Sequence, residues 1–137
     1  MGKQIRIGIA GYGNLGRGVE AAVAKNPDMT LVGIFTRRAP ESLTPLFAQT
    51  PVHGIAQLPE FRDAVDVLIL CGGSKDDLPR QGPEMAAMFN IVDSFDTHAR
   101  IPEYFESVDA PARAAGKTAL ISIGWDPGLF SINRLYG

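Results

Sequence analysis

Three glycines, at positions 11, 13 and 16, have the spacing of a loop that holds phosphate groups. They follow an apolar run at residues 5–10 and precede a stretch with helical periodicity, so a strand, a tight turn and a helix come in succession. In that context Gly11 permits the turn, Gly13 lets the backbone approach a pyrophosphate, and Gly16 lets helix and strand pack closely. Phosphates bind there because the amides and the positive dipole end of the helix face them. The sequence predicts a dinucleotide site, the alternative being a structural glycine turn.

A threonine and two arginines follow at the end of a second predicted strand. A site for NAD places Asp or Glu about 20 residues beyond the glycines, where the carboxylate accepts hydrogen bonds from the ribose 2′-hydroxyl. This chain has Thr36, Arg37 and Arg38 at that position, with no acid before Glu41. Guanidinium groups bind phosphate oxygens with a planar fork, whereas a carboxylate repels them. These residues favour NADP over NAD, and the alternative is a solvated arginine pair on a surface loop.

Small residues end the buried strand predicted at residues 65–71. Gly72, Gly73 and Ser74 let the backbone pass close to the nicotinamide half of a cofactor. Cys71, the only cysteine, is interpreted as a small core residue rather than a nucleophile, because no histidine or other base is near it in sequence. The residues predicted to contact the cofactor are Gly11, Tyr12, Gly13, Asn14, Leu15, Gly16, Thr36, Arg37, Arg38, Cys71, Gly72, Gly73 and Ser74.

Two carboxylates, Asp96 and Asp126, are the candidates for chemistry on a substrate beside the nicotinamide. A carboxylate there binds a substrate ammonium group, or accepts the proton of an amine before hydride leaves the attached carbon. Asp126 also precedes Pro127, an arrangement typical of a helix N-cap, so spacing alone favours the capping role. Asp93 fits no more than the end of its strand. Trp125, the only tryptophan, fits either the core or a cover over an apolar part of the substrate, and no metal-ligand spacing occurs.

These residues need a scaffold that gathers loops at one edge. Near-continuous apolar strands alternate with helical segments, which is the pattern of an α/β fold with a Rossmann-type doubly wound parallel sheet. The main strands are expected at residues 5–10, 29–36, 65–71, 90–93 and 118–123. Ligands bind beyond the carboxyl ends of the strands in such sheets. The polar clusters that follow these strands are therefore expected to converge, at residues 11–16, 36–38, 72–74, 93–98 and 125–126.

The pattern also predicts several local features. The residues expected on one face of the first helix are Leu15, Val19, Ala22 and Val23. Prolines divide the segment after Arg38 into short pieces, with a helical turn near residues 43–48 and a brief strand near residues 52–55. In the second half of the chain, Pro111 is expected to kink or divide a helix, and Gly116 to cap it.

Composition limits the class of protein. With 137 residues, 45% of them hydrophobic, the chain suits one soluble globular domain. A formal net charge of −2 gives no general attraction to nucleic acid or to an anionic membrane. A single cysteine excludes an internal disulfide framework and fits a reducing compartment. No apolar stretch has the length of a membrane span and no signal-peptide pattern opens the sequence, so the cytoplasm is the expected location.

Four segments closely resemble the NADP-dependent meso-diaminopimelate dehydrogenases. They are residues 11–17 (GYGNLGR), 32–38 (VGIFTRR), 93–98 (DSFDTH) and 124–134 (GWDPGLFSINR). The likeness extends over almost the whole chain and is most specific in the last segment. It implies reversible oxidative deamination at the D-configured centre of meso-2,6-diaminopimelate, which gives L-2-amino-6-oxopimelate, ammonia and NADPH in bacterial lysine and cell-wall precursor metabolism.

The resemblance also implies roles for particular residues. Asp96 and Asp126 contact the amino-acid head at the reacting centre, and Trp125 lines the pocket. The amine must be neutral when hydride leaves, so Asp126 or Asp96, directly or through a water, is the candidate that takes its proton. One alternative is another NADP-dependent reductase of the lysine or aspartate pathway, with which residues 125–128 disagree. The other is an NADP-binding regulatory module, in which the two aspartates have no obvious use.

The chain is less than half as long as members of that family. The resemblance therefore implies that residues 1–124 form an NADP-binding Rossmann domain. Residues 125–137 would begin the connection to a substrate and dimerisation domain that is absent from this chain. It also implies a homodimer for the full-length enzyme and a small amino acid as its substrate. We expect nucleotide binding, with little or no turnover, from the 137 residues alone.

Overall fold

The computed structural model describes residues 3–124, which belong to two compact units. The first unit is Met1–Cys71 and the second is Gly72–Gly137. Both units contain parallel strands with helices packed against them. No helix between residues 3 and 124 combines the length and the apolar character needed to cross a bilayer.

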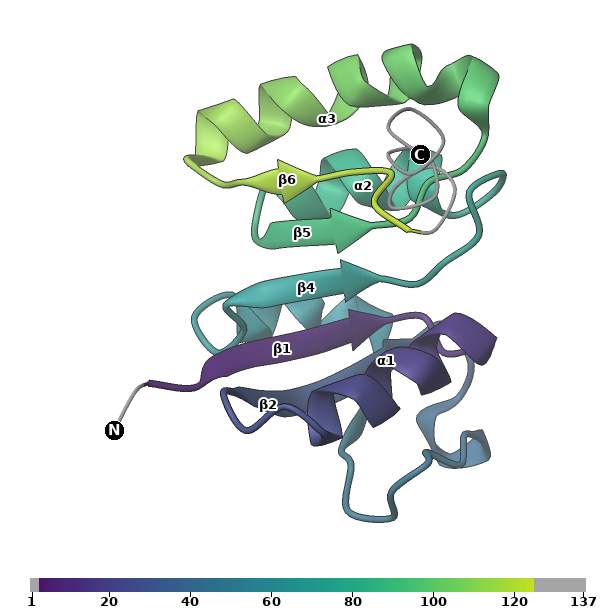
Figure 1. The fold of residues 1–137 in the computed structure, drawn as a ribbon, viewed down its shortest axis with the longest axis vertical. Helices are drawn as coiled ribbons and strands as arrows, with labels where there is room; N and C mark the ends of the chain where they lie inside the picture. Colours follow the sequence, from purple (N-terminus) through teal and green to yellow (C-terminus); the bar gives the residue numbers. More distant parts are fainter. Residues whose placement is uncertain (1–2, 125–137) are drawn as a thin grey trace, which may run out of the picture. The chain divides into compact units, whose positions relative to one another are not determined.

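The first unit is a parallel sheet in which the strands lie in the order β3, β2, β1, β4. The strands are β1 (Ile5–Ala10), β2 (Met29–Thr36), β3 (Val52–Gly54) and β4 (Val67–Leu70). Strand β1 has a partner on each side, and its last four residues are buried. Helix α1 (Asn14–Ala24) packs against β1 and β2 (Figure 1). Short 3-10 helices, η1 (Pro40–Ser42) and η2 (Ile55–Phe61), lie on either side of β3 in the chain.

The buried face of α1 differs from the expected one. Gly16, Glu20 and Val23 are buried, whereas Leu15 is 46% exposed and Ala22 is exposed. Of the four residues expected to share a face, only Val23 is buried and Val19 is half-buried, so the buried face is not centred on that set. The close approach of Gly16 to the preceding turn sets the rotation of the helix, and positions four and seven residues further on then face inward.

The segment between β2 and β3 differs as well. The helical turn expected at residues 43–48 is wrong, because helical geometry is confined to the preceding turn η1. The amides of Leu46 and Phe47 donate to the side chain of Glu20 instead of to a helical backbone ladder. The brief strand expected near residues 52–55 is confirmed as β3.

In the second unit, β5 (Asn90–Asp93) pairs in parallel with β6 (Ala119–Leu120). Helix α2 (Leu78–Ala86) packs against β5 and against α3 (Ile101–Ala115), and α3 runs along β6 (Figure 1). A short 3-10 helix, η3 (His98–Arg100), leads into α3. Tyr104 of α3 lies so close to Gly82 of α2 that position 82 has no space for a Cβ atom. The two helices therefore meet through a glycine and an aromatic ring.

Helix α3 continues through Pro111 as one helix, so of the two outcomes expected at this proline, a kink or a division, the division is wrong. Pro111 begins the last turn, and Ser107, whose carbonyl loses its usual amide partner, is exposed to water. Gly116 has φ 68° and ends the helix in the left-handed conformation, which confirms the predicted cap. Strand β6 is shorter than expected, and Ser122, with φ 57°, follows it in a conformation that non-glycine residues seldom adopt.

Candidate functional site

The glycine turn after β1 has the geometry that its spacing predicts. Gly11 has φ 95°, and its amide donates to the carbonyl oxygen of Phe35 over 2.8 Å. A Cβ at position 16 would lie 2.6 Å from the carbonyl oxygen of Gly11, so only glycine allows this packing. A Cβ at position 13 would meet nothing within 4 Å, which leaves that side of the turn open to a ligand.

The start of α1 suits an anion. Gly13 is the N-cap residue, no side chain caps the helix, and its first turn contains no acidic residue. The first amides of a helix have no partner within it and carry partial positive charge. Asn14 and Leu15, which follow Gly13, are exposed. This end of the helix therefore fits a phosphate group.

A cavity of about 280 Å³ opens beside the glycine turn. The residues that line it are Tyr12, Gly13, Asn14, Arg17, Arg38, Ser42, Leu43 and Thr44. This lining combines two guanidinium groups with the hydroxyl-bearing residues Tyr12, Ser42 and Thr44 and includes no acidic side chain. Its charge and hydrogen-bonding groups fit a phosphate-bearing ligand rather than a cation.

The structure gives different positions to the three residues predicted for a 2′-phosphate. Arg38 lines the cavity, and its Nη2 donates to the carbonyl oxygen of Tyr12 over 2.6 Å. Thr36 is only 3% exposed, and its hydroxyl accepts the Arg38 amide over 3.1 Å, so it shapes the loop. Arg37 is exposed and is not among the lining residues. Their contacts with a cofactor stay predictions.

Sequence reasoning did not assign Arg17, Ser42 and Thr44 to the site. Arg17 follows Gly13 by four residues, and its amide donates to the Gly13 carbonyl oxygen over 3.0 Å. A basic residue one turn into the helix after such a glycine loop is a signal that could have identified it. Ser42 and Thr44 carry no comparable signal, because the path of their segment depends on contacts with residues distant in sequence.

Cys71 has the surroundings of a core residue, as predicted. Its side chain packs against the cluster formed by Ile9, Tyr12, Ile34 and Leu43. Burial raises the pKa of its thiol to about 12, so the thiolate is scarce at neutral pH. Its amide donates to the carbonyl oxygen of Ala10 over 2.7 Å, which ties the end of β4 to the end of β1.

In the second unit, the structure brings the predicted Ser74 and Asp96 together. The amide of Asp96 donates to the Ser74 hydroxyl over 2.9 Å, and the Asp96 residue is exposed. The Gly73 amide donates to Asp77 Oδ2 over 3.0 Å. A Cβ at position 72 would lie 2.7 Å from Asp77 Cβ, so Gly72 is required for this turn. Hydrogen bonds therefore join the loop at residues 72–77 to the loop that contains Asp96, and Asp96 lies exposed at the surface.

Asp93 does more than end its strand, contrary to the expectation. It is 2% exposed, and its carboxylate accepts the hydroxyl of Tyr104, the amide of Phe95 over 3.0 Å and the amide of Ser122 over 2.9 Å. Burial, together with the bond to Asp93, raises the pKa of the Tyr104 hydroxyl, which stays protonated and donates. Asp93 thus fixes the segment after β6, because its carboxylate accepts the Ser122 amide and its carbonyl oxygen accepts the Ile123 amide.

Two predicted site residues, Trp125 and Asp126, lie outside the described residues. Between residues 3 and 124 there is no group of three or more His, Cys, Asp or Glu side chains arranged to hold a metal ion.

Comparison with known proteins gives close relatives. No family model matches the sequence. The meso-diaminopimelate D-dehydrogenase of Acetivibrio thermocellus is 58% identical over 135 residues, which are 98% of this chain and 40% of that protein. An engineered D-amino acid dehydrogenase bound to NADP⁺ superposes with a TM-score of 0.89 at 51% identity, over 98% of this chain and 40% of that one. The Corynebacterium glutamicum diaminopimelate dehydrogenase in complex with DAP gives a TM-score of 0.88, with the same identity and coverage.

The chain thus spans about 40% of the length of the curated relatives it matches. The predicted α/β fold class, a Rossmann-type parallel sheet, is confirmed by the parallel strand pairings and by these superpositions. The predicted resemblance to the diaminopimelate dehydrogenases is confirmed as well.

Proposed function

We propose that this chain, a member of the meso-diaminopimelate D-dehydrogenase family that spans about 40% of its relatives' length, forms the NADP-binding part of such an enzyme. The observation that carries the proposal is the cavity beside the glycine turn. Arg17 and Arg38 line it, no acidic side chain does, and the uncapped start of α1 adjoins it. An engineered relative bound to NADP⁺ supports the identity of the nucleotide.

The residues proposed to hold NADP fall into three groups. The amides at the start of α1 bind the pyrophosphate beside Gly13. Arg38 and Arg17 bind the 2′-phosphate through charge-assisted hydrogen bonds. Gly72, Gly73 and Ser74 pass beside the nicotinamide. When bound, NADP supplies the hydride acceptor, and the residues of the chain bind and orient it.

The activity proposed for the enzyme is NADP-dependent oxidative deamination of the D-centre of meso-2,6-diaminopimelate. The names of the relatives and the DAP-bound structure support this substrate. Asp96, exposed beside Ser74, is proposed to bind the ammonium group, and Asp126 to take the proton of the amine. Trp125 is proposed to cover the substrate. A homodimer and a cytoplasmic location complete the proposal, supported by the family resemblance and by the single cysteine.

A titration of the 137-residue chain with NADPH and NADH, followed by nicotinamide fluorescence, tests the cofactor. We expect NADPH to bind at least about tenfold more tightly, since a phosphate held by guanidinium groups is worth more than about 1.4 kcal/mol. Arg37→Ala should weaken NADPH binding, and Arg38→Ala should weaken it more because Arg38 lines the cavity. Tighter binding of NADH, or no loss in either variant, contradicts the proposal.

The proton-acceptor role is tested separately in the complete, active enzyme. Asp126→Asn should lower turnover far more than it weakens NADP binding, because the amide cannot accept the proton of the amine. Equal losses in both quantities would refute the role of Asp126 without affecting the cofactor assignment.

A further inference from the structure

Tyr12 contacts Arg17 and Arg38, the two arginines that form the cationic walls of the cavity beside the glycine turn. The guanidinium carbon of Arg17 lies 5.7 Å from the centre of the Tyr12 ring, within reach of cation–π attraction. Nη2 of Arg38 donates to the Tyr12 carbonyl oxygen over 2.6 Å. Because Tyr12 itself is only 8% exposed, its ring and carbonyl give both guanidinium groups a fixed point of contact.

Tyr12 also adjoins the third wall of the cavity, formed by Ser42, Leu43 and Thr44, because Leu43 belongs to the same buried cluster as Tyr12. The amide of Leu46, two residues beyond that wall, donates to Tyr12 Oη over 2.8 Å and to Glu20 Oε1 over 3.0 Å. The hydroxyl donates its own hydrogen to the same Glu20 oxygen. One tyrosine thus connects all three walls.

Glu20 completes this network from within α1. It is 1% exposed, and its second oxygen accepts the Thr50 hydroxyl over 2.7 Å and the Phe47 amide over 3.2 Å. Burial raises the pKa of Glu20, but its hydrogen bonds together outweigh burial and leave the pKa below its ordinary value. The ionised carboxylate is therefore the form that the network holds at neutral pH.

We propose that Glu20 and Tyr12 are positioning residues that set the preference of this site for a nucleotide with a 2′-phosphate. The proposal rests on the proposed function, and it adds that Glu20, which does not line the cavity, acts through Tyr12 and the segment at residues 42–47. Glu20 orients the Tyr12 hydroxyl and holds that segment. Tyr12 in turn holds Arg17 and Arg38 against the open side of Gly13.

The energetic reason is preorganisation. Binding is weakened when loops and long side chains must be ordered at the same time, by about twofold to tenfold in affinity for each flexible side chain. A wall already held by Glu20, and guanidinium groups already in contact with Tyr12, avoid part of that cost. The gain should fall mainly on the extra phosphate, because Arg17 and Arg38, the residues proposed to hold it, are the ones that Tyr12 contacts.

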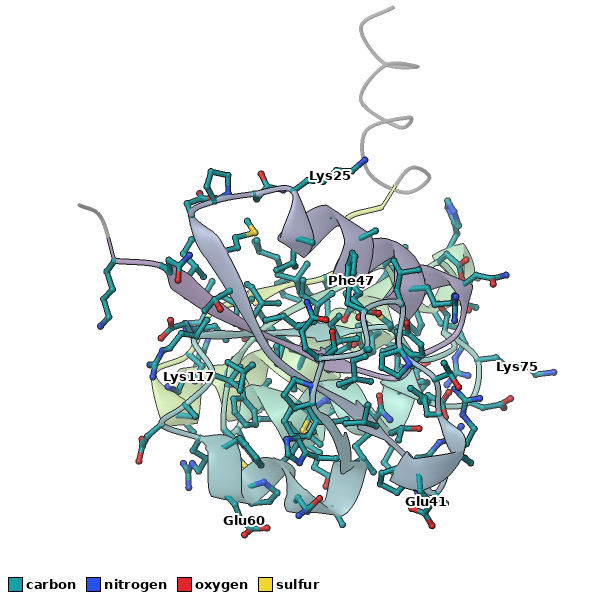
Figure 2. The ribbon with its side chains drawn as sticks, turned by 90° about the horizontal axis from the view of Figure 1, so that it is seen from below. Lys25, Glu41, Phe47, Glu60, Lys75 and Lys117 are labelled. Atoms are coloured by element: carbon teal, nitrogen blue, oxygen red, sulfur yellow. The ribbon has the colours of Figure 1, made fainter. Side chains whose placement is uncertain are left out.

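The test measures the affinities of adenosine 2′,5′-bisphosphate and adenosine 5′-monophosphate by calorimetry. The variants are Glu20→Gln, which replaces an oxygen acceptor by an amide donor, and Tyr12→Phe, which keeps the ring under Arg17 and removes only the hydroxyl. Glu60→Gln is the matched control, since Glu60 is an exposed carboxylate on η2, and its side chain points outward in Figure 2. Phe47, also labelled in Figure 2, belongs instead to the segment that Glu20 holds. The melting temperature is recorded for each variant.

We expect Glu20→Gln and Tyr12→Phe to reduce the preference for the bisphosphate by about tenfold or more, with the monophosphate affinity nearly unchanged. Glu60→Gln should change neither affinity. An unchanged preference in a folded variant, whether or not its melting temperature falls, shows that the network is merely structural and overturns the inference. Should Glu20→Gln fail to fold, Tyr12→Phe alone decides it. Equal binding of both probes by the unaltered chain would instead refute the proposed 2′-phosphate site.

Discussion

Both units bury a carboxylate against a tyrosine hydroxyl, but the two tyrosines face different surroundings. In the first unit Glu20 accepts the hydroxyl of Tyr12, and in the second Asp93 accepts that of Tyr104. The ring of Tyr12 faces the guanidinium group of Arg17. The ring of Tyr104 stacks on Phe95, with the ring centres 4.2 Å apart and the planes at 9°.

The difference shows how one hydrogen-bonded pair serves two purposes. Around Glu20 the donors come from a loop that borders a basic cavity, so the pair shapes a binding surface. Around Asp93 they come from Phe95, Tyr104 and Ser122, so the pair joins a strand, a helix and the segment after β6. Changes at Asp93 should therefore affect folding most, and changes near Glu20 should affect recognition most.

The largest effect is expected for Asp93→Ala. Three buried or half-buried donors lose their acceptor, each at a cost of about 1–3 kcal/mol, so the free energy of unfolding should fall by about 3 kcal/mol or more. Urea denaturation followed by circular dichroism measures it. Asp109→Ala is the control in α3, because its ion pair with Arg113 is largely exposed and worth less than about 1 kcal/mol. Equal losses in the two variants would show that Asp93 is not the centre of this unit.

Gly16→Ala should have the next largest effect. Its Cβ would lie 2.6 Å from the Gly11 carbonyl oxygen, so the turn must shift, at a cost of about 1–3 kcal/mol. NADPH binding, measured by fluorescence, should weaken with it. Gly18→Ala is the control, since a Cβ there meets nothing within 4 Å and alanine favours the helix by up to about 1 kcal/mol. Unchanged binding by Gly16→Ala would separate the glycine turn from the nucleotide site.

Tyr104→Phe sharpens the comparison between the two tyrosines. The ring keeps its stacking on Phe95, but Asp93 loses a donor, so the free energy of unfolding should fall by about 1–2 kcal/mol. The affinity for adenosine 2′,5′-bisphosphate should stay the same, in contrast to Tyr12→Phe. A loss of that affinity in Tyr104→Phe would mean that the two pairs are not divided between folding and recognition.

The smallest effect is expected for Asp66→Asn in the first unit. Arg6 forms a two-pronged ion pair with Asp66 and lowers the pKa of that carboxyl to about 2. The pair is roughly one-third exposed, so its contribution at neutral pH should be about 1 kcal/mol or less. Because the pKa of Asp66 is lower in the folded protein than its ordinary value of 3.8, the ionised carboxylate stabilises the fold at pH values above 3.8. This contribution is lost as the pH falls from 3.8 to about 2. The free energies of unfolding of the unaltered chain and of Asp66→Asn should therefore converge as the pH is lowered from 7 to 2. A difference that stays constant over this range would contradict the prediction.

The sequence predicted the features that depend on local pattern. The bounds of β1 and β2, the positive φ of Gly11, the close packing at Gly16 and the cap at Gly116 follow from apolar runs and from the freedom of glycine. The burial of Glu20 did not follow, because three of its four donors lie 26 to 30 residues further along the chain. The helical turn expected at residues 43–48 was wrong for the same reason.

The candidate site was predictable to a similar degree. Arg38 was predicted from its place at the end of the second strand, and it lines the cavity. Asp96 and Ser74 were predicted because each follows a strand end, and a hydrogen bond joins them. Their contacts with ligands stay predictions. Ser42 and Thr44 were not predicted, since the path of their segment depends on contacts with residues distant in sequence, among them Tyr12 and Glu20. The roles of Trp125 and Asp126 stay predictions.

The most direct test of the account is the ratio of NADPH to NADH dissociation constants in Arg38→Ala, with Arg62→Ala as the control. Arg38 lines the cavity, whereas Arg62 is an exposed arginine outside its lining. We predict that Arg38→Ala reduces the preference for NADPH by about tenfold to a hundredfold, the worth of one or two charge-assisted hydrogen bonds. Arg62→Ala should leave the ratio unchanged. Equal ratios in both variants and in the unaltered chain would contradict the claim that this cavity recognises the 2′-phosphate.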